Sequence, residues 1–199
     1  IKAVNDYDTS KYGYLNSIAT DRPFRLEGYL YPDTYTFKVD ARPEDIIGTM
    51  LTRFNVIYES NIKDNLGGKK LDDIIKIASM IEKEAITDSD RPRIASVIYN
   101  RLNKGMKLQI DATVQYALGS HKEDLSLKDL GVDSKYNTYK VDGLPEGPIS
   151  NPGLKSIAAA LNPAETDYIY YVAKGDGSHF FTDDYKEFLE AKNAFKEDK

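Results

Sequence analysis

The sequence predicts an α+β fold in which several helices pack with a small antiparallel sheet. Apolar residues recur at helical spacing in several stretches, most clearly over residues 71–85. Near the C-terminus, Asp167–Lys174 is rich in aromatic and β-branched residues, and Gly175–Ser178 predicts a hairpin turn into His179–Thr182. Helices beside one antiparallel hairpin are typical of the α+β class.

The first half of the chain predicts one domain preceded by a short irregular segment. Residues 1–22 are polar, and we expect a lead-in from a missing N-terminal region, with the domain proper covering residues 23–199. The chain begins at Ile1 rather than Met, which predicts a piece of a longer protein. Leu26–Phe37 reads as extended chain with a turn, and proline and acids after Arg42 predict a helix that ends near Asn61.

The second half continues with short helices and shaped loops. A helix follows Asp90 and closes at Gly105, and Asp111 is expected to cap the helix Ala112–Leu118. The run Gly143–Gly153 is dense in glycine and proline, which predicts a rigid surface loop. Further helix caps are expected from polar residues before apolar runs: Ser150 or Asn151 before one helix, and Asp183 before the last.

The helix over residues 71–85 carries the most informative pair of residues, Glu82 and Glu84. At roughly 100° per residue they lie on opposite shoulders of the apolar face, so they cannot form a close carboxylate pair. Glu84 follows Ile77, Met80 and Ile81 at helical spacing, and desolvation there would favour its protonated form. A protonated carboxyl near neutral pH suits a general acid. The alternative is that both glutamates are solvated surface residues.

Composition excludes several classes of function. The net charge of −5 and the pI of about 5.2 leave no basic field for nucleic acid. The chain has no cysteine, and His121 and His179 are too few and too far apart for a histidine metal motif, so we expect no metal. No apolar run approaches the roughly 18 residues of a membrane span. The 15 tyrosines suit a groove for a polar polymer such as a glycan, or serve as ordinary boundary residues.

From about Leu26 to Glu190 the chain resembles the endolytic murein transglycosylases of the YceG-like family, formerly labelled aminodeoxychorismate lyases. The resemblance is carried by LEGYLYPDTYTF, IASMIEKEA, RPRIASVIYNRL, GMKLQIDATVQYALG, YNTY, GLPEGPISNPG and YYVAKGDGSHFFTDD. One departure is Glu146, where the family more usually has a second proline.

The resemblance implies a catalytic domain outside the cytoplasmic membrane, held by an N-terminal membrane helix and preceded by a LysM-like subdomain. It implies cleavage of the β-1,4 bond between N-acetylmuramic acid and N-acetylglucosamine inside nascent glycan strands, leaving 1,6-anhydromuramyl ends. Glu84, the second glutamate of the E-K-E motif, is then the acid and afterwards the base. No cofactor is implied, and cell-wall synthases such as penicillin-binding proteins are expected partners. Candidate substrate-binding residues are Gln109, Asp111, Tyr136, Asn137, Thr138, Tyr139 and Asn151, with His179 a weaker candidate.

Two other functions remain open from sequence. A pyridoxal-phosphate lyase would need a Schiff-base lysine near a phosphate loop, and Lys83 has no glycine-rich loop beside it. A non-catalytic peptidoglycan-binding module of the cell-wall synthesis machinery would use the tyrosines for attachment alone.

Overall fold

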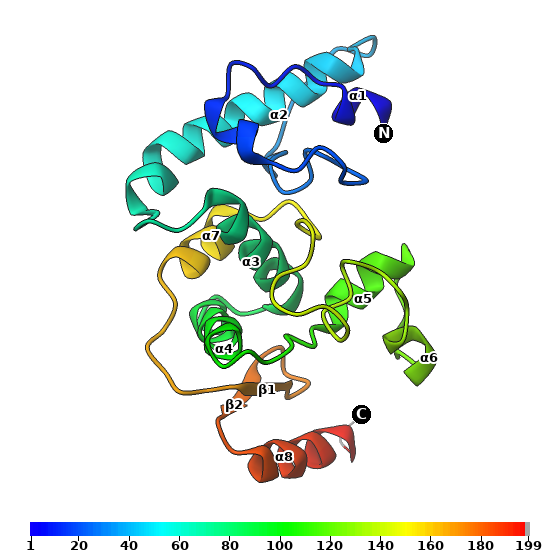
Figure 1. The fold of residues 1–199 in the computed structure, drawn as a ribbon, viewed down its shortest axis with the longest axis vertical. Coiled ribbons are helices and arrows are strands. Elements are labelled where there is room, and N and C mark those ends of the chain that lie inside the picture. The colour runs from blue at the N-terminus through cyan, green and yellow to red at the C-terminus, as the bar shows by residue number, and fades with distance from the viewer. Residues whose placement is uncertain (198–199) are drawn as a thin grey trace.

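The computed structural model describes residues 1–197 and contains helices with one small sheet, which confirms the predicted α+β class. The helices are α1 (Lys2–Asn5), α2 (Pro43–Ile57), α3 (Leu71–Glu84), α4 (Arg91–Asn103), α5 (Asp111–Leu118), α6 (Leu127–Leu130), α7 (Leu154–Leu161) and α8 (Tyr185–Glu197), and the strands are β1 (Tyr170–Ala173) and β2 (His179–Thr182). Figure 1 shows α1 and α2 at one end, α3, α4 and α7 in the middle, and the hairpin with α8 at the other end.

Helix α3 is the centre of the molecule. It packs against α7, α4 and α5, and the predicted apolar face is buried together with Ile75, Ser79 and Met80. The additional burial arises because the glycine- and proline-rich loop also covers α3. Ser79 Oγ accepts a hydrogen bond from the backbone amide of Ile149 at 3.0 Å, and Ser150 Oγ donates to the carbonyl of Ser79 at 3.0 Å. The loop therefore reaches the helix that carries Glu84.

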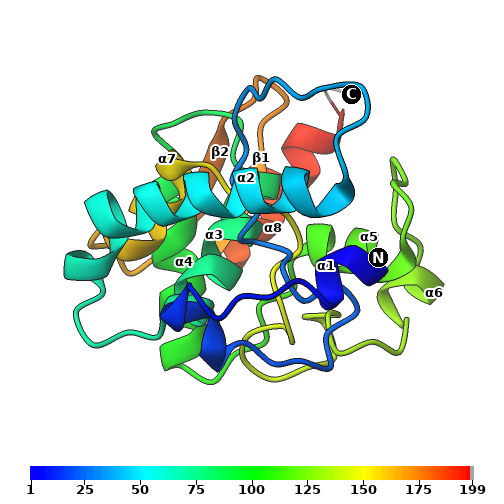
Figure 2. The same cartoon turned by 90° about the horizontal axis from the view of Figure 1, so that it is seen from above.

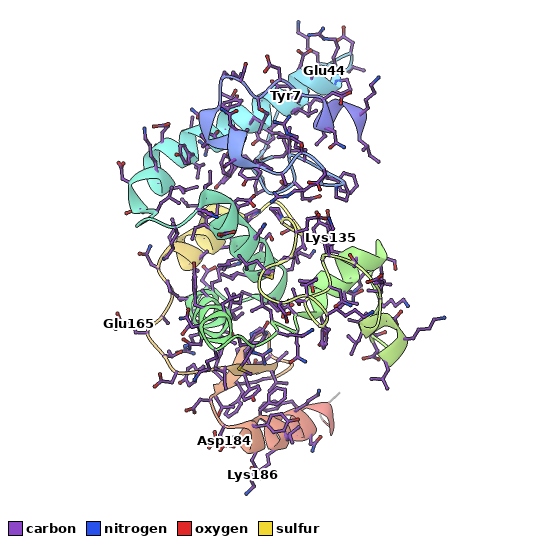
Figure 3. The ribbon with its side chains drawn as sticks, viewed as in Figure 1. Tyr7, Glu44, Lys135, Glu165, Asp184 and Lys186 are labelled. Carbon is purple, nitrogen blue, oxygen red and sulfur yellow. The ribbon has the colours of Figure 1, made fainter. Side chains whose placement is uncertain are left out.

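The hairpin and α8 form the C-terminal end of the fold. Strands β1 and β2 pair antiparallel with Tyr171 opposite Phe181, and α8 packs against both strands. The predicted cap Asp183 is wrong by one residue, because the Asp184 carboxylate accepts hydrogen bonds from the amides of Lys186 and Glu187 at 2.7 and 2.9 Å. Figure 3 shows Asp184 at the hairpin end of the molecule, away from Tyr7 and Glu44 at the α2 end.

The N-terminal segment and α2 form the end of the fold opposite the hairpin (Figure 1). Tyr12, Leu15 and Ile18 are buried in the same hydrophobic cluster as Leu51 and Phe54 of α2, and Figure 2 shows α2 crossing over α3 from above. The domain boundary near residue 22 stays an expectation. The predicted helix over residues 42–61 corresponds to α2 followed by a π-helical turn, Tyr58–Ile62. In the described part of the chain, no helix is both long enough and apolar enough to cross a bilayer.

Candidate active site

Glu84 is the last residue of α3, where the backbone turns extended at Ala85. Its Oε2 accepts a hydrogen bond from the hydroxyl of Tyr171 on β1 at 3.2 Å. Burial, followed by the negative charge of Asp111, raises the pKa of Glu84 to about 7, while hydrogen bonds from Tyr171 and the amide of Ala112 act in the opposite direction. The C-terminal end of a helix also disfavours a negative charge. The carboxyl therefore keeps its proton to a higher pH than an ordinary glutamate does.

Glu82, two residues earlier on the same helix, has a different environment. Its Oε2 accepts hydrogen bonds from Ser156 Oγ at 2.5 Å and from the amide of Gly153 at 3.3 Å, and lies 3.6 Å from Arg91 Nη1. These contacts tie α3 to the start of α7. The two glutamates lie on different sides of the helix. Glu82 therefore makes contacts that hold α3 to α7, and Glu84 lies at the wall of a cavity.

Two cavities meet at Glu84 and Asp111. The strand-side cavity has a volume of about 440 Å³ and includes Arg101, Tyr139 and Tyr171 in its wall. The helix-side cavity, of about 760 Å³, is lined by Phe24 and parts of α5 and the glycine- and proline-rich loop. Because both cavities contain the two carboxyl residues, a chain-like ligand lying across them would pass Glu84 in its middle.

Tyrosines line both cavities. Tyr139, Tyr170, Tyr171 and Tyr185 contribute to the strand-side cavity, and Tyr116 and Tyr136 to the helix-side cavity. Other tyrosines, such as Tyr12 and Tyr29, are core residues near α2. Tyrosines therefore line cavities as well as the core, and binding of a glycan to those in the cavities stays a prediction.

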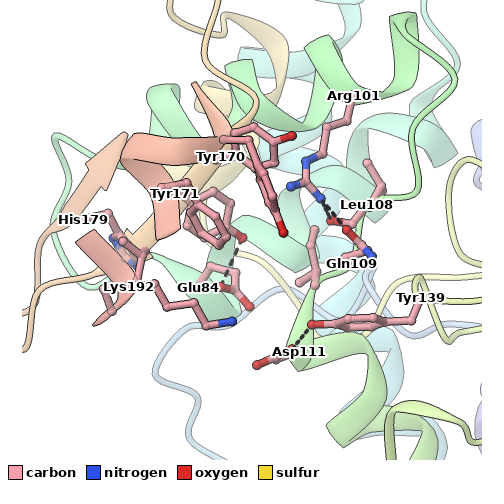
Figure 4. Close-up of a pocket in the computed structure, with 15 residues that line it drawn as sticks. Glu84, Arg101, Leu108, Gln109, Asp111, Tyr139, Tyr170, Tyr171, His179 and Lys192 are labelled. Carbon is pink, nitrogen blue, oxygen red and sulfur yellow. Dashed lines mark hydrogen bonds between the residues drawn. The ribbon is translucent and has the colours of Figure 1, made fainter. Parts of the chain in front are cut away.

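Asp111, Gln109 and Tyr139 form one side of the strand-side cavity (Figure 4). Tyr139 donates its hydroxyl hydrogen to Asp111 Oδ1 at 2.5 Å. Asp111 is the first residue of α5 rather than its cap, since the capping position is Ile110 and no side chain caps the helix. A negative charge is favoured in a first helical turn. Gln109 has a φ of +52°, a strained conformation for a residue other than glycine, and such strain concentrates at functional sites.

The remaining predicted binding residues have structural contacts. Thr138 is buried, with its Oγ1 2.9 Å from the amide of Ile110 and 2.9 Å from Thr113 Oγ1. The buried Asn137 amide donates to the carbonyls of Leu130 and Val132 at 3.0 and 2.8 Å. These contacts hold the loop that presents Tyr139. Contact of either residue with substrate stays a prediction.

Tyr136 lines the helix-side cavity, whereas Asn151 is not among the described residues that line either cavity. Asn151 does not cap α7, whose capping position is Gly153 without a side-chain bond. Its Oδ1 instead accepts hydrogen bonds from the amides of Gly28 and Leu30 at 2.8 and 3.1 Å. Tyr136 is buried, with its ring centroid 4.8 Å from that of Tyr116, and lines the helix-side cavity.

His179 is buried and paired with Asp90. His179 Nδ1 lies 3.0 Å from Asp90 Oδ2, and the same carboxylate oxygen accepts from the His179 amide at 2.8 Å. The imidazole packs edge-on against Tyr171 with the centroids 5.4 Å apart. His179 therefore supports the tyrosine that contacts Glu84. Asp90 occupies the capping position of α4 but makes no side-chain cap bond to that helix.

Two residues of the site, Tyr171 and Arg101, are absent from the candidates that the sequence supplies. Tyr171 lies in the strand that the sequence predicts, but nothing in a strand pattern says which distant helix a side chain meets. Arg101 falls near the end of the helix that the sequence predicts before Gly105, and the structure places it in the wall of the strand-side cavity. Over residues 1–197, no cluster of three or more His, Asp or Glu side chains is arranged to hold a metal ion.

Comparison with known proteins agrees with the motifs. The YceG-like family profile matches residues 3–194. An endolytic murein transglycosylase of Bacillus subtilis is 48% identical over 174 residues, covering 85% of this chain and 48% of the relative. One from Streptococcus pneumoniae strain R6 is 39% identical over 158 residues, covering 75% of this chain and 28% of the relative.

A crystal structure of a YceG-like protein from Listeria monocytogenes has the same fold. It superposes with a TM-score of 0.81 at 45% identity, covering 96% of this chain and 61% of the Listeria chain. The chain thus spans about half or less of the length of the curated relatives that it matches. From the profile match along almost its whole length, the chain belongs to the YceG-like family.

Proposed function

We propose that this chain is the catalytic domain of an endolytic murein transglycosylase. It would cleave the β-1,4 bond between N-acetylmuramic acid and N-acetylglucosamine within glycan strands and leave 1,6-anhydromuramyl ends. The observation that carries the proposal is Glu84, a carboxyl with a pKa of about 7 in the wall that two cavities share. The names of the relatives support the same reaction.

One carboxyl is sufficient for this chemistry. In the first step the Glu84 carboxyl gives its proton to the leaving O4 as the bond from O4 to the anomeric carbon breaks. In the second, the substrate's own C6 hydroxyl oxygen bonds to the anomeric carbon, and the Glu84 carboxylate takes the C6 hydroxyl proton. A pKa near 7 suits both roles, because neither protonation state is strongly favoured.

Neighbouring groups would assist both steps. Positive charge develops on the sugar ring as the bond breaks, and the carboxylate of Asp111 in the same cavity wall would stabilise it. Tyr171 donates to Glu84 and so fixes the direction of its carboxyl group. Ordinary glycosidases need a second carboxylate to deliver water or to form a covalent intermediate, and intramolecular attack by the C6 hydroxyl removes that need.

The cellular setting proposed for the domain is the outer side of the cytoplasmic membrane. The names of the relatives give murein as the material that they act on, which supports a location where murein strands are accessible. A single N-terminal membrane helix and association with cell-wall synthases are part of the same proposal.

Mass spectrometry of the products from intact murein tests the function, with Glu84→Gln and Glu82→Gln as matched variants. We expect 1,6-anhydromuramyl products from the wild type and from Glu82→Gln if it remains folded, and none from Glu84→Gln. Reducing-end products would instead indicate hydrolysis. Strand binding without any product from the wild type would favour a peptidoglycan-binding module.

A further inference from the structure

Arg101 is a buried cation without an anionic partner. Its side chain comes from the last turn of α4 and the residue is only 9% exposed. Its hydrogen bonds within residues 1–197 go to carbonyl and amide oxygens, and no Asp or Glu side chain of that range forms an ion pair with it. Burial lowers the pKa of the guanidinium, and the surrounding tyrosines are the groups that oppose this. A buried cation is costly unless it is paired, so the site favours an anion from outside the chain.

The contacts of Arg101 account for only part of its hydrogen-bonding capacity. Nε donates to the carbonyl of Ile169 at 2.7 Å, and Nη1 donates to the carbonyl of Leu108 at 2.7 Å. Nη1 is also 3.2 Å from the carbonyl of Lys107 and 3.5 Å from Gln109 Oε1. The other terminal nitrogen, Nη2, has no hydrogen-bond partner in the described residues. Arginine carries five N–H donors in a planar fork, so donors are left for a ligand.

The guanidinium is held in a fixed orientation at the cavity. It lies over the ring of Tyr170 with its central carbon 5.4 Å from the ring centroid. Figure 4 shows it projecting into the space that it shares with Glu84, Asp111 and Tyr139. A preorganised arginine of this kind loses little entropy when it binds an oxyanion.

The charges in the strand-side cavity favour a carboxylate ligand. Lys192 of α8 is a second cation in the wall, and Asp111 is an acid already engaged with Tyr139. When Glu84 is protonated, as the first catalytic step requires, the two cations exceed the one remaining carboxylate. An anionic group of the substrate would restore the balance.

We propose that Arg101 binds a carboxylate of the muramyl unit in the strand-side cavity. This inference rests on the proposed function, since it takes the substrate to be a murein strand. The carboxylate has two possible sources with the same chemistry, namely the lactyl group of muramic acid when it is free and the stem peptide when one is attached. Arg101 would thereby distinguish muramyl from glucosaminyl units beside Glu84.

NMR titration of the chain with small ligands tests the proposal without requiring cleavage. N-acetylmuramic acid carries a free lactyl carboxylate, muramyl dipeptide carries a single peptide carboxylate in its place, and N-acetylglucosamine carries neither. We expect at least one muramyl ligand to bind about tenfold more tightly than N-acetylglucosamine, as a charge-assisted hydrogen bond predicts. Preference for the first ligand identifies the lactyl source and preference for the second the peptide source. Equal binding of all three would overturn the proposal.

Two variants test whether Arg101 is the residue that makes muramyl ligands bind more tightly than N-acetylglucosamine. Arg101→Lys keeps the charge and loses the fork, and it should lose most of the tenfold preference. Arg93→Lys is the matched control, because Arg93 is on the same helix, is exposed and lies outside the cavity wall. A preference that survives Arg101→Lys unchanged would contradict the proposal.

A further binding measurement uses only the wild-type chain, so it does not depend on whether Arg101→Lys folds. The methyl ester of the preferred ligand has no negative charge, and we expect it to bind the wild-type chain about tenfold more weakly than the free acid. Equal binding of ester and acid would overturn the proposal. If the wild-type chain shows the ligand preference but cleaves no murein, the proposed function is rejected while the carboxylate site on Arg101 stands.

Discussion

The hydroxyl of Tyr171 is a hydrogen-bond donor to Glu84 Oε2 at 3.2 Å, linking β1 to the end of α3 across 87 positions of sequence. The tyrosine ring is itself supported by His179, whose imidazole is paired with Asp90 at the start of α4. The Glu84 carboxyl is therefore oriented by the hairpin, and its protonation depends on a group that sequence patterns do not connect to it. Substitutions around Glu84 should change that protonation in directions that the contacts determine.

Tyr171→Phe should shift the pH dependence of cleavage toward higher pH. The hydrogen bond from Tyr171 lowers the pKa of Glu84, so its removal lets burial raise that pKa further. Turnover should also fall about fivefold, because loss of one hydrogen bond of about 1 kcal/mol leaves the carboxyl less well oriented. The measurement is the rate of anhydromuramyl product formation against pH. Tyr168→Phe is the control, since Tyr168 stacks on Phe181 and lies outside the cavity wall.

Asp111→Asn should shift the same profile in the opposite direction. The charge of Asp111 raises the pKa of Glu84, and an amide keeps the acceptor for Tyr139 while removing the charge. With a lower pKa, Glu84 becomes ionised at lower pH and the alkaline limb of the rate profile moves toward acid. If Asp111→Asn and Tyr171→Phe move the limb in the same direction, the limb does not report Glu84.

Glu84→Gln should make the protein more stable at alkaline pH and leave it unchanged at acid pH. The folded pKa of about 7 is above the value of about 4.3 for an unfolded glutamate, so the folded state binds more protons between these values. The wild type thus keeps its full stability below about pH 4 and loses about 4 kcal/mol as the pH rises through 7. Glutamine carries no such cost. Thermal unfolding of both proteins at about pH 4 and about pH 8.5 provides the comparison.

The control for the stability measurement is Glu82→Gln. Its carboxylate accepts hydrogen bonds from Ser156 and Gly153, so the amide should bring no gain in stability at the alkaline pH. A Glu84→Gln protein that is less stable than the wild type at alkaline pH would show that Glu84 stabilises the fold as a carboxylate.

The helices and strands are largely predictable from the sequence, because periodicity is a local property. The helix 71–85 appears as α3, its apolar face is buried, and the strand near residue 170 pairs through the predicted hairpin. Caps are less predictable. Asp111, Asn151 and Asp90 are the residue types that cap helices, but each carboxyl or amide finds a partner far along the chain instead. Tertiary contacts decide between two hydrogen-bonding uses that local sequence leaves equivalent.

The site is predictable in part. Glu84 can be distinguished from Glu82 by its apolar neighbours, since desolvation follows from helical spacing. Its partner Tyr171 and the buried Arg101 cannot be found in this way, because their roles arise where β1, α4 and α3 meet. The strain at Gln109 is likewise a result of tertiary structure. The backbone amide of Gln109 donates a hydrogen bond to the carbonyl of Thr138 at 3.1 Å.

Gly28 is the position where a single methyl group should disturb the site from a distance. Its φ is +91°, and a Cβ there would lie 2.5 Å from Pro148 Cγ and 2.6 Å from Ile75 Cγ2. Both neighbours are fixed, since one is a proline ring and the other belongs to the buried face of α3. Gly28→Ala should therefore cost several kcal/mol of unfolding free energy through overpacking together with backbone strain.

Gly143→Ala separates the two causes. Gly143 has a similar φ of +77°, but no atom lies within 4 Å of the place that an alanine methyl group would take, so this substitution should cost only the backbone strain of about 1 kcal/mol. Chemical denaturation of both variants measures the difference. Pro148 adjoins Ile149, which lines the helix-side cavity, so Gly28→Ala should also weaken strand binding while Gly143→Ala leaves it unchanged. Equal losses of stability in the two variants would mean that the loop yields to the methyl group and that its packing on α3 does not shape the cavity.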